Sequence, residues 1–178
     1  MKHSLNLVVR LLIICVVAAF CLGVTYDVTS PIIAKLAAEE AEVAYRTLLP
    51  DAVEFVEMDF GADEAFAKVA GVMIGVNQSE TVGWCINMKA MGYKGEIPFI
   101  IGVLPDGSIT GLRIGAHEET VGLGSKISSP SFYEQFDGVR PPVDLKTDIQ
   151  AISGATISSR AVVTAVNTAH AFYQAHLQ

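Results

Sequence analysis

The residues from Leu5 to Tyr26 form an apolar run that only Asn6, Arg10 and Thr25 interrupt. At a helical rise of about 1.5 Å per residue, a run of this length spans roughly 33 Å, which matches the hydrocarbon core of a bilayer. The run therefore predicts a transmembrane helix at residues 5–26, with the lipid bilayer as a partner. The remaining residues are enough for one domain of ordinary size.

A cleaved signal peptide is the alternative, since Lys2 and Arg10 suit its basic region. The residues that follow the apolar run, Thr25-Tyr26-Asp27, do not form a small-x-small cleavage site. The bulky Phe20 before Cys21 does not suit a lipoprotein site either. The sequence therefore favours a retained anchor.

The charges around the span predict its orientation. Lys2 and Arg10 lie before it, whereas the first charge after it is Asp27. The positive-inside bias then places residues 1–4 in the cytoplasm and the domain on the outer, periplasmic side of the inner membrane. Of the 12 basic residues in the chain, the other 10 follow the span together with all 19 acidic ones. Such an acidic domain is a poor partner for nucleic acid.

The segment 27–50 reads as a linker helix. Ser30-Pro31 is typical of a helix start, with a capping serine followed by proline in the first turn, and Pro50 is expected to end the helix. The segment 51–178 is then the folded domain outside the membrane.

Two pairs of apolar segments in this domain read as antiparallel strands. Residues 66–76 and 81–88 flank the polar residues 77–80, and residues 98–104 and 108–114 flank the turn Pro105-Asp106-Gly107. Strands with helices before and after them predict an α+β domain.

The segment Ile152–Val162 reads as a short polar loop that leads directly into a helix from Ser159 to about Leu177. Its predicted apolar face consists of Ala161, Val162, Ala165, Val166 and Ala169. Free amide groups and the positive end of the helix dipole make such a start suitable for phosphate. A Ser/Thr-rich segment before a helix is, however, more often a plain N-cap.

Two further loops are rich in glycine. Residues 92–97 allow close approach of a ligand to the backbone, and residues 117–126 read as a solvated polar loop in which His117, Glu118 and Glu119 form surface pairs. These three neighbours do not have the spacing of metal ligands, and we expect no metal site.

Together these motifs resemble a known family. The Gly-Tyr-x-Gly loop, the Asp-Gly hairpin, His-Glu-Glu-Thr-x-Gly-Leu-Gly and Ser-Gly-Ala-Thr before Ser-Ser-Arg-Ala-Val occur in the order seen in the G subunits of Rnf ion-translocating electron transport complexes. The related C subunits of Na⁺-translocating NADH:quinone reductases share the last motif. In both families FMN is joined through its phosphate to the motif threonine, which corresponds here to Thr156.

The resemblance implies an electron-carrying FMN-binding subunit with a single membrane helix. Its partners would be the other membrane subunits of an Rnf-type complex and the flavin transferase that attaches FMN. Such a complex couples electron transfer between ferredoxin and NAD to transport of Na⁺ or H⁺. Around Thr156, the implied cofactor-binding residues are Ser153, Gly154, Ala155, Ser158 and Ser159 at the helix start, with Tyr93, Thr120, Gly122, Leu123 and Gly124 from the two loops.

Two positions depart from the family pattern. Val121 replaces the usual proline, and Gln150 replaces the aspartate that usually lies three residues before the motif serine. We expect the second departure to weaken recognition by the transferase. The alternatives to an Rnf protein are the C-type component of a quinone reductase, which usually has a longer domain, and a membrane-anchored assembly or binding module without cofactor.

Overall fold

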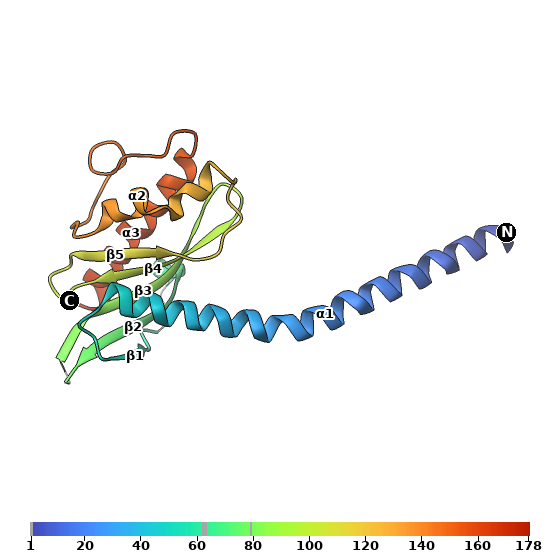
Figure 1. Ribbon diagram of the computed structural model, residues 1–178, viewed down its shortest axis with the longest axis horizontal. Coiled ribbons are helices and arrows are strands. Elements are labelled where there is room, and N and C mark those ends of the chain that lie inside the picture. Colours follow the sequence, from blue (N-terminus) through green and yellow to red (C-terminus); the bar gives the residue numbers. More distant parts are fainter. Residues whose placement is uncertain (1, 62–63, 79) are drawn as a thin grey trace. The chain divides into compact units, whose positions relative to one another are not determined.

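The computed structural model describes residues 2–61, 64–78 and 80–178 (Figure 1). Met1 of the predicted cytoplasmic end and Ser79 of the predicted 77–80 turn lie outside these residues. The chain forms two compact units, Met1–Glu42 and Val43–Gln178.

The first unit consists of most of helix α1 (Lys2–Leu48). This helix is long and apolar enough to cross a membrane. Its large apolar side chains are exposed, for example Phe20 at 71% and Leu22 at 72%. Exposure of this kind is unusual in water and normal for a helix surrounded by lipid.

The helix start expected at Ser30-Pro31 is wrong, because Pro31 lies inside continuous α1. Proline removes one backbone donor from a helix interior. The segment that follows is rich in alanine and glutamate, which favour helix, and α1 continues through it to Leu48, two residues before Pro50.

The second unit is built on a five-stranded antiparallel sheet in the order β1-β2-β3-β4-β5. The strands are β1 (Glu54–Met58), β2 (Val69–Asn77), β3 (Glu80–Met91), β4 (Glu96–Val103) and β5 (Ile109–Ile114). The four predicted strands are confirmed. The edge strand β1 was not predicted, because its five residues include two glutamates and none of them is buried.

One face of the sheet packs against α3 (Thr156–His176), which lies against β3 and β4 (Figure 1). Side chains alternate along a strand, so Phe99 and Ile101 of β4 enter this core while Ile100 between them faces the other side. The predicted apolar face of the C-terminal helix is confirmed, since its five residues are all buried: Ala161, Val162, Ala165, Val166 and Ala169.

The opposite face of the sheet holds a smaller cluster formed by Leu48, Leu49, Ala52 and Cys85. A short 3-10 helix η1 (Glu64–Phe66) precedes β2. Between β5 and α3 lie the short helices η2 (Gly124–Ser128), α2 (Pro130–Tyr133) and η3 (Glu134–Phe136). An α+β domain after one long N-terminal helix is therefore confirmed.

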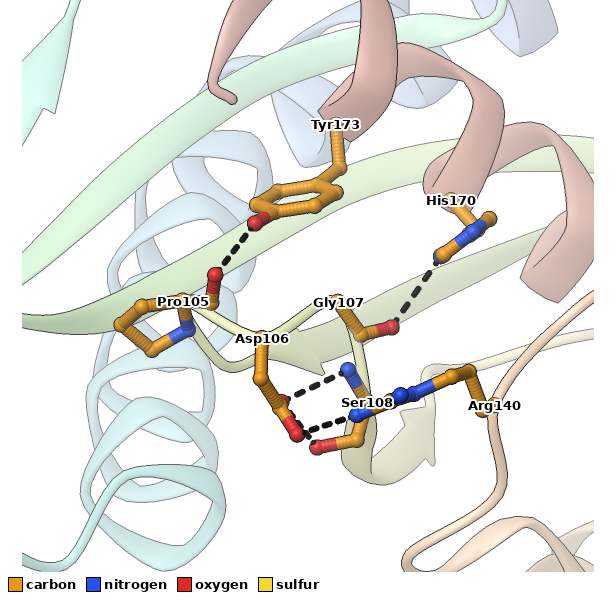
Figure 2. Close-up of polar contacts among 7 residues, drawn as sticks. All are labelled: Pro105, Asp106, Gly107, Ser108, Arg140, His170 and Tyr173. Carbon is orange, nitrogen blue, oxygen red and sulfur yellow. Dashed lines mark hydrogen bonds and ion pairs between the residues drawn. The ribbon is translucent and has the colours of Figure 1, made fainter.

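The turn between β4 and β5 fastens the C-terminal half of α3 to the sheet (Figure 2). The hydroxyl of Tyr173 donates to the carbonyl of Pro105 at 2.6 Å, and His170 Nδ1 lies 3.1 Å from the carbonyl oxygen of Gly107. Gly107 adopts a φ of +80° in this turn, a conformation that favours glycine. With its C-terminal half held, α3 presents its first turn at a fixed position above β3 and β4.

Candidate functional site

Helix α3 begins at Thr156, three residues before the predicted start at Ser159. The residue before it, Ala155, offers no side-chain cap. The amides of Thr156, Ile157 and Ser158 form no hydrogen bond with any of the described residues. The plain N-cap interpretation is therefore wrong, and these amides are free to bind an anion.

The two buried serines of this first turn have partners other than these amides. Ser159 accepts the amide of Ile152 at 3.1 Å and donates to the carbonyl of Ala155 at 3.0 Å. Ser158 donates its hydroxyl to Glu119. Both serines are buried, at 0% and 2% exposure, and Ser153 is exposed in the loop.

Thr156 is exposed and lines three neighbouring hollows in the surface. We call the first the glycine-loop pocket, of about 490 Å³, which is within the range of small-molecule sites. Eight of the eleven predicted site residues line it together with Glu119 and Ile157: Tyr93, Thr120, Leu123, Gly124, Gly154, Ala155, Thr156 and Ser158. The other three, Ser153, Gly122 and Ser159, do not line it.

The rim of the glycine-loop pocket carries apolar side chains that face solvent. Tyr93 is 65% exposed, Leu123 is 45% exposed and Ile157 is 55% exposed. Gly154 adopts a φ of +77°, and a Cβ on it would lie 3.3 Å from Leu123 Cδ2, so the backbone of the helix-start loop passes close to this rim. An apolar rim around free amides suits a ligand with a flat ring at one end and an anion at the other.

Glu119 is the residue that sequence reasoning missed. It was expected in a solvated loop, but it is 5% exposed and accepts the amides of Tyr93 at 2.8 Å and Lys94 at 3.0 Å as well as the Ser158 hydroxyl. Burial alone would raise the pKa of Glu119, but these hydrogen bonds and the nearby His117 hold the pKa below its ordinary value. The carboxyl group is therefore ionised at neutral pH.

The second hollow, the basic groove of about 800 Å³, lies on another side of Thr156. Lys146 and Arg160 line it, and Arg160 also lines the third hollow, of about 260 Å³, together with Lys68. All three basic side chains are exposed, and none forms an ion pair with any of the described residues. Two basic side chains, Lys146 and Arg160, and one carboxylate, that of Asp144, thus line the groove beside Thr156.

Comparison with known proteins identifies the family of this chain. The family model of the FMN-binding domain matches residues 92–171, which contain both glycine loops and the first turn of α3. Over 176 residues the chain is 35% identical to the G subunit of the ion-translocating oxidoreductase complex of Methanosarcina acetivorans, across 94% of this chain and 93% of that protein. The chain belongs to this family of G subunits.

A second member of the family is nearly as similar. The G subunit of the Na⁺-translocating ferredoxin:NAD⁺ oxidoreductase complex of Acetobacterium woodii is 33% identical over 184 residues, across 92% of this chain and 88% of that protein. The predicted membership of the Rnf G subunits is thereby confirmed. The FMN-binding domain supports FMN as the cofactor, and the apolar α1 supports a single-pass membrane protein.

A solved structure shows the same fold. The C subunit of the Na⁺-translocating NADH-quinone reductase of Parabacteroides distasonis superimposes with a TM-score of 0.53 at 22% identity, across 76% of this chain and 81% of that one. The present chain and that quinone-reductase protein therefore share a fold.

Proposed function

We propose that this chain is the electron-carrying flavoprotein subunit of an Rnf-type membrane complex, with FMN attached through its phosphate to Thr156. The observation that carries the proposal is the position of the Thr156 hydroxyl. This hydroxyl is exposed beside three free amides and three hollows, whereas the hydroxyls of Ser158 and Ser159 are bonded within the protein.

The first turn of α3 provides the phosphate seat. The amides of Thr156, Ile157 and Ser158 donate to the phosphate oxygens, and the helix dipole favours the negative charge. Gly154 and Ala155 leave the approach to these amides open, since neither has a long side chain. Arg160, one helical turn after Thr156, adds a positive charge on the groove side.

The glycine-loop pocket takes the isoalloxazine ring. Tyr93 and Leu123 provide apolar contact area at its rim, and Thr120 and Gly124 line its wall. FMN, when bound, supplies the electron transfer, and the protein supplies its position and electrostatic environment. Ser158 is bonded to Glu119 in the loop 117–126, and Ser159 is bonded to Ile152 in the loop before α3, so each serine holds one of the loops that border the pocket. Ser153 and Gly122 lie in these same two loops.

The chain division follows the sequence prediction. Residues 1–4 are cytoplasmic, residues 5–26 span the bilayer, and residues 51–178 form the FMN-binding domain outside the cytoplasm. Residues 27–50 link the span to this domain, and the end of the linker, at Leu48 and Leu49, packs against the sheet. Lys2 and Arg10 before the span support this orientation. A covalent link suits this location, because a dissociating cofactor would be lost there.

The partners follow from the family. The relative from Acetobacterium woodii is named as part of a complex that acts on ferredoxin and NAD⁺ and translocates Na⁺. We infer that this chain passes electrons among the membrane subunits of a complex of this kind, coupled to transport of Na⁺ or H⁺. A flavin transferase is its second partner, since the free hydroxyl needs an activated FMN donor.

Replacement of Thr156 by alanine tests the attachment. Thr156→Ala removes the attaching oxygen and raises helix propensity, so the folded protein should lose its flavin fluorescence on a denaturing gel. Thr156→Ser keeps a hydroxyl and reports whether the transferase accepts serine. The matched controls are Ser153→Ala, which removes the other exposed hydroxyl of this loop, and Ser159→Ala.

Mass mapping of the labelled peptide completes the test. Undiminished covalent flavin in Thr156→Ala would contradict the proposal, and loss of label in Ser153→Ala alone would move the attachment to Ser153. Colourless wild-type protein purified from a host with an active transferase would favour an assembly module without cofactor.

A further inference from the structure

The carboxylate of Glu119 joins three segments that are far apart in the sequence. Its Oε1 accepts the amides of Tyr93 and Lys94 in the loop between β3 and β4, and its Oε2 accepts the hydroxyl of Ser158 in the first turn of α3. The third segment is its own loop, which leads to Leu123 and Gly124. All three segments border the glycine-loop pocket.

Two glycines leave room for this carboxylate. A Cβ on Gly92 would lie 2.5 Å from Glu119 Oε1, and a Cβ on Gly124 would overlap Glu119 Oε2 and lie 2.9 Å from Ser158 Oγ. Real Cβ atoms do not approach other atoms so closely. The close packing on both sides indicates that the wall of the pocket is assembled around the Glu119 side chain.

The charge of Glu119 is retained despite its burial. Three hydrogen-bond donors and the start of α3 stabilise the ionised form. A glutamine of the same size can keep part of this geometry but loses the negative charge. The hydrogen-bonding role and the charge can therefore be separated by substitution.

We propose that Glu119 is a positioning residue for the flavin ring: it holds the Tyr93 and Leu123 sides of the glycine-loop pocket against the first turn of α3 and sets a fixed negative charge in the pocket wall. This inference rests on the proposed function of the pocket. The Thr156 hydroxyl does not contact Glu119. Attachment of FMN and positioning of its ring are therefore distinct properties, and loss of Glu119 affects the second.

The test uses the full-length chain in detergent, isolated with covalent flavin. Glu119→Gln should keep the in-gel flavin label, shift the flavin midpoint potential to more positive values and give a faster decay of flavin fluorescence anisotropy. The potential rises because a negative charge beside the ring opposes its reduction. The anisotropy decays faster because the loops that confine the ring are no longer tied together.

Glu118→Gln is the matched control, since it removes the neighbouring carboxylate from an exposed side chain. Ser158→Ala is the second variant; it keeps the charge and both amide bonds, so it should speed the anisotropy decay with little shift in potential. This variant also carries the test if Glu119→Gln does not fold.

The outcomes separate the two proposals. Unlabelled wild-type protein would remove the proposed function itself. Labelled Glu119→Gln with wild-type potential and anisotropy would overturn the role of Glu119, as would a fall in thermal midpoint as its only change. If Glu119→Gln does not fold, wild-type anisotropy in labelled Ser158→Ala would likewise overturn it.

Discussion

Gln135 holds the backbone of Gln150 from both sides. Its Oε1 accepts the Gln150 amide at 2.8 Å, and its Nε2 donates to the Gln150 carbonyl at 3.4 Å. The Gln150 side chain itself is exposed. Position 150 therefore has a fixed backbone and a side chain that a protein partner can reach, six residues before Thr156.

This geometry predicts the effect of restoring an aspartate at position 150. Gln150→Asp changes only an exposed side chain and should raise the rate of FMN labelling in a heterologous host, if a transferase there reads a carboxylate. The readout is in-gel flavin fluorescence against time. Asp148→Asn is the control for the carboxylate that lies out of register. Equal labelling rates in the wild type and Gln150→Asp would show that Gln150 is no handicap.

The elements with local signals could be predicted from the sequence. The apolar run, the Asp-Gly hairpin and the buried face of α3 each depend on residues that are close together in the chain. Edge strand β1 could not be predicted in the same way, because its conformation depends on pairing with β2. The start of α3 was placed too late, because Thr156-Ile157-Ser158 resembles a cap and is helical here.

Most of the candidate site was predicted from motifs, whereas its central contact was not. Tyr93, Leu123 and Thr156 come from three segments, and their motifs gave no sign of a shared partner. The burial of Glu119 depends on the space left by Gly92 and Gly124, 27 residues before and 5 residues after it. This arrangement is a tertiary contact, and the two glycines are the signal in the sequence that could have indicated close packing at these positions.

The orientation of the membrane helix is the second prediction. Because Lys2 and Arg10 precede the span, a reporter fused after Gln178 should be active only when it is one that functions outside the cytoplasm. A reporter that functions only in the cytoplasm, fused at the same residue, is the matched control and should stay silent. The reverse pattern would contradict the proposed location of the domain.

The contacts of the Asp106 carboxylate predict that the stability of the protein depends on pH (Figure 2). Its side chain accepts the hydroxyl of Ser108 at 2.6 Å and the amide of Ser108 at 3.0 Å, and it pairs with Arg140 at 2.5 Å. These contacts hold the pKa of Asp106 at about 2, below its ordinary 3.8. Because the pKa is lower in the folded state, the stabilisation is present above pH 3.8 and is lost as the pH falls towards 2.

The measurement is the thermal midpoint at several pH values. Asp106→Asn should melt below the wild type near neutral pH, and the gap should close in acid as the wild-type carboxylate is protonated. Glu118→Gln serves as the control for the loss of one exposed carboxylate. A constant gap across the acid range would mean that the contacts of Asp106 do not depend on its charge.

Gly92 predicts a steric effect on the loop between β3 and β4. An alanine Cβ there would lie 2.5 Å from both Glu119 Oε1 and Ile97 Cδ1, so Gly92→Ala should destabilise the protein by about 1–3 kcal/mol. Gly95→Ala in the same loop is the matched control, because no atom lies within 4 Å of its added Cβ. Denaturant unfolding of the two variants gives the comparison, and equal midpoints would contradict the close packing around Glu119.

Arg160 predicts a charge effect on FMN attachment. A positive charge near the start of a helix opposes the helix dipole, and Arg160 has no acidic partner among the described residues. A phosphate on Thr156, one turn away, would supply the missing anion. Arg160→Gln should therefore slow labelling by about two- to fivefold, as expected for one exposed ionic contact.

Two variants distinguish this contact from a general effect of charge. Arg160→Lys keeps the positive charge and should label at close to the wild-type rate, with the remaining difference due to the lost guanidinium geometry. Arg140→Gln removes the positive charge that pairs with Asp106 in the turn between β4 and β5. This turn contacts α3 at His170, roughly 20 Å along the helix from Thr156, so the variant should leave labelling unchanged. Because exposed ionic contacts weaken with added salt, the difference between the wild type and Arg160→Gln should shrink at high ionic strength. Equal slowing in Arg140→Gln and Arg160→Gln would attribute the effect to the net charge of the domain, and not to a contact with the phosphate.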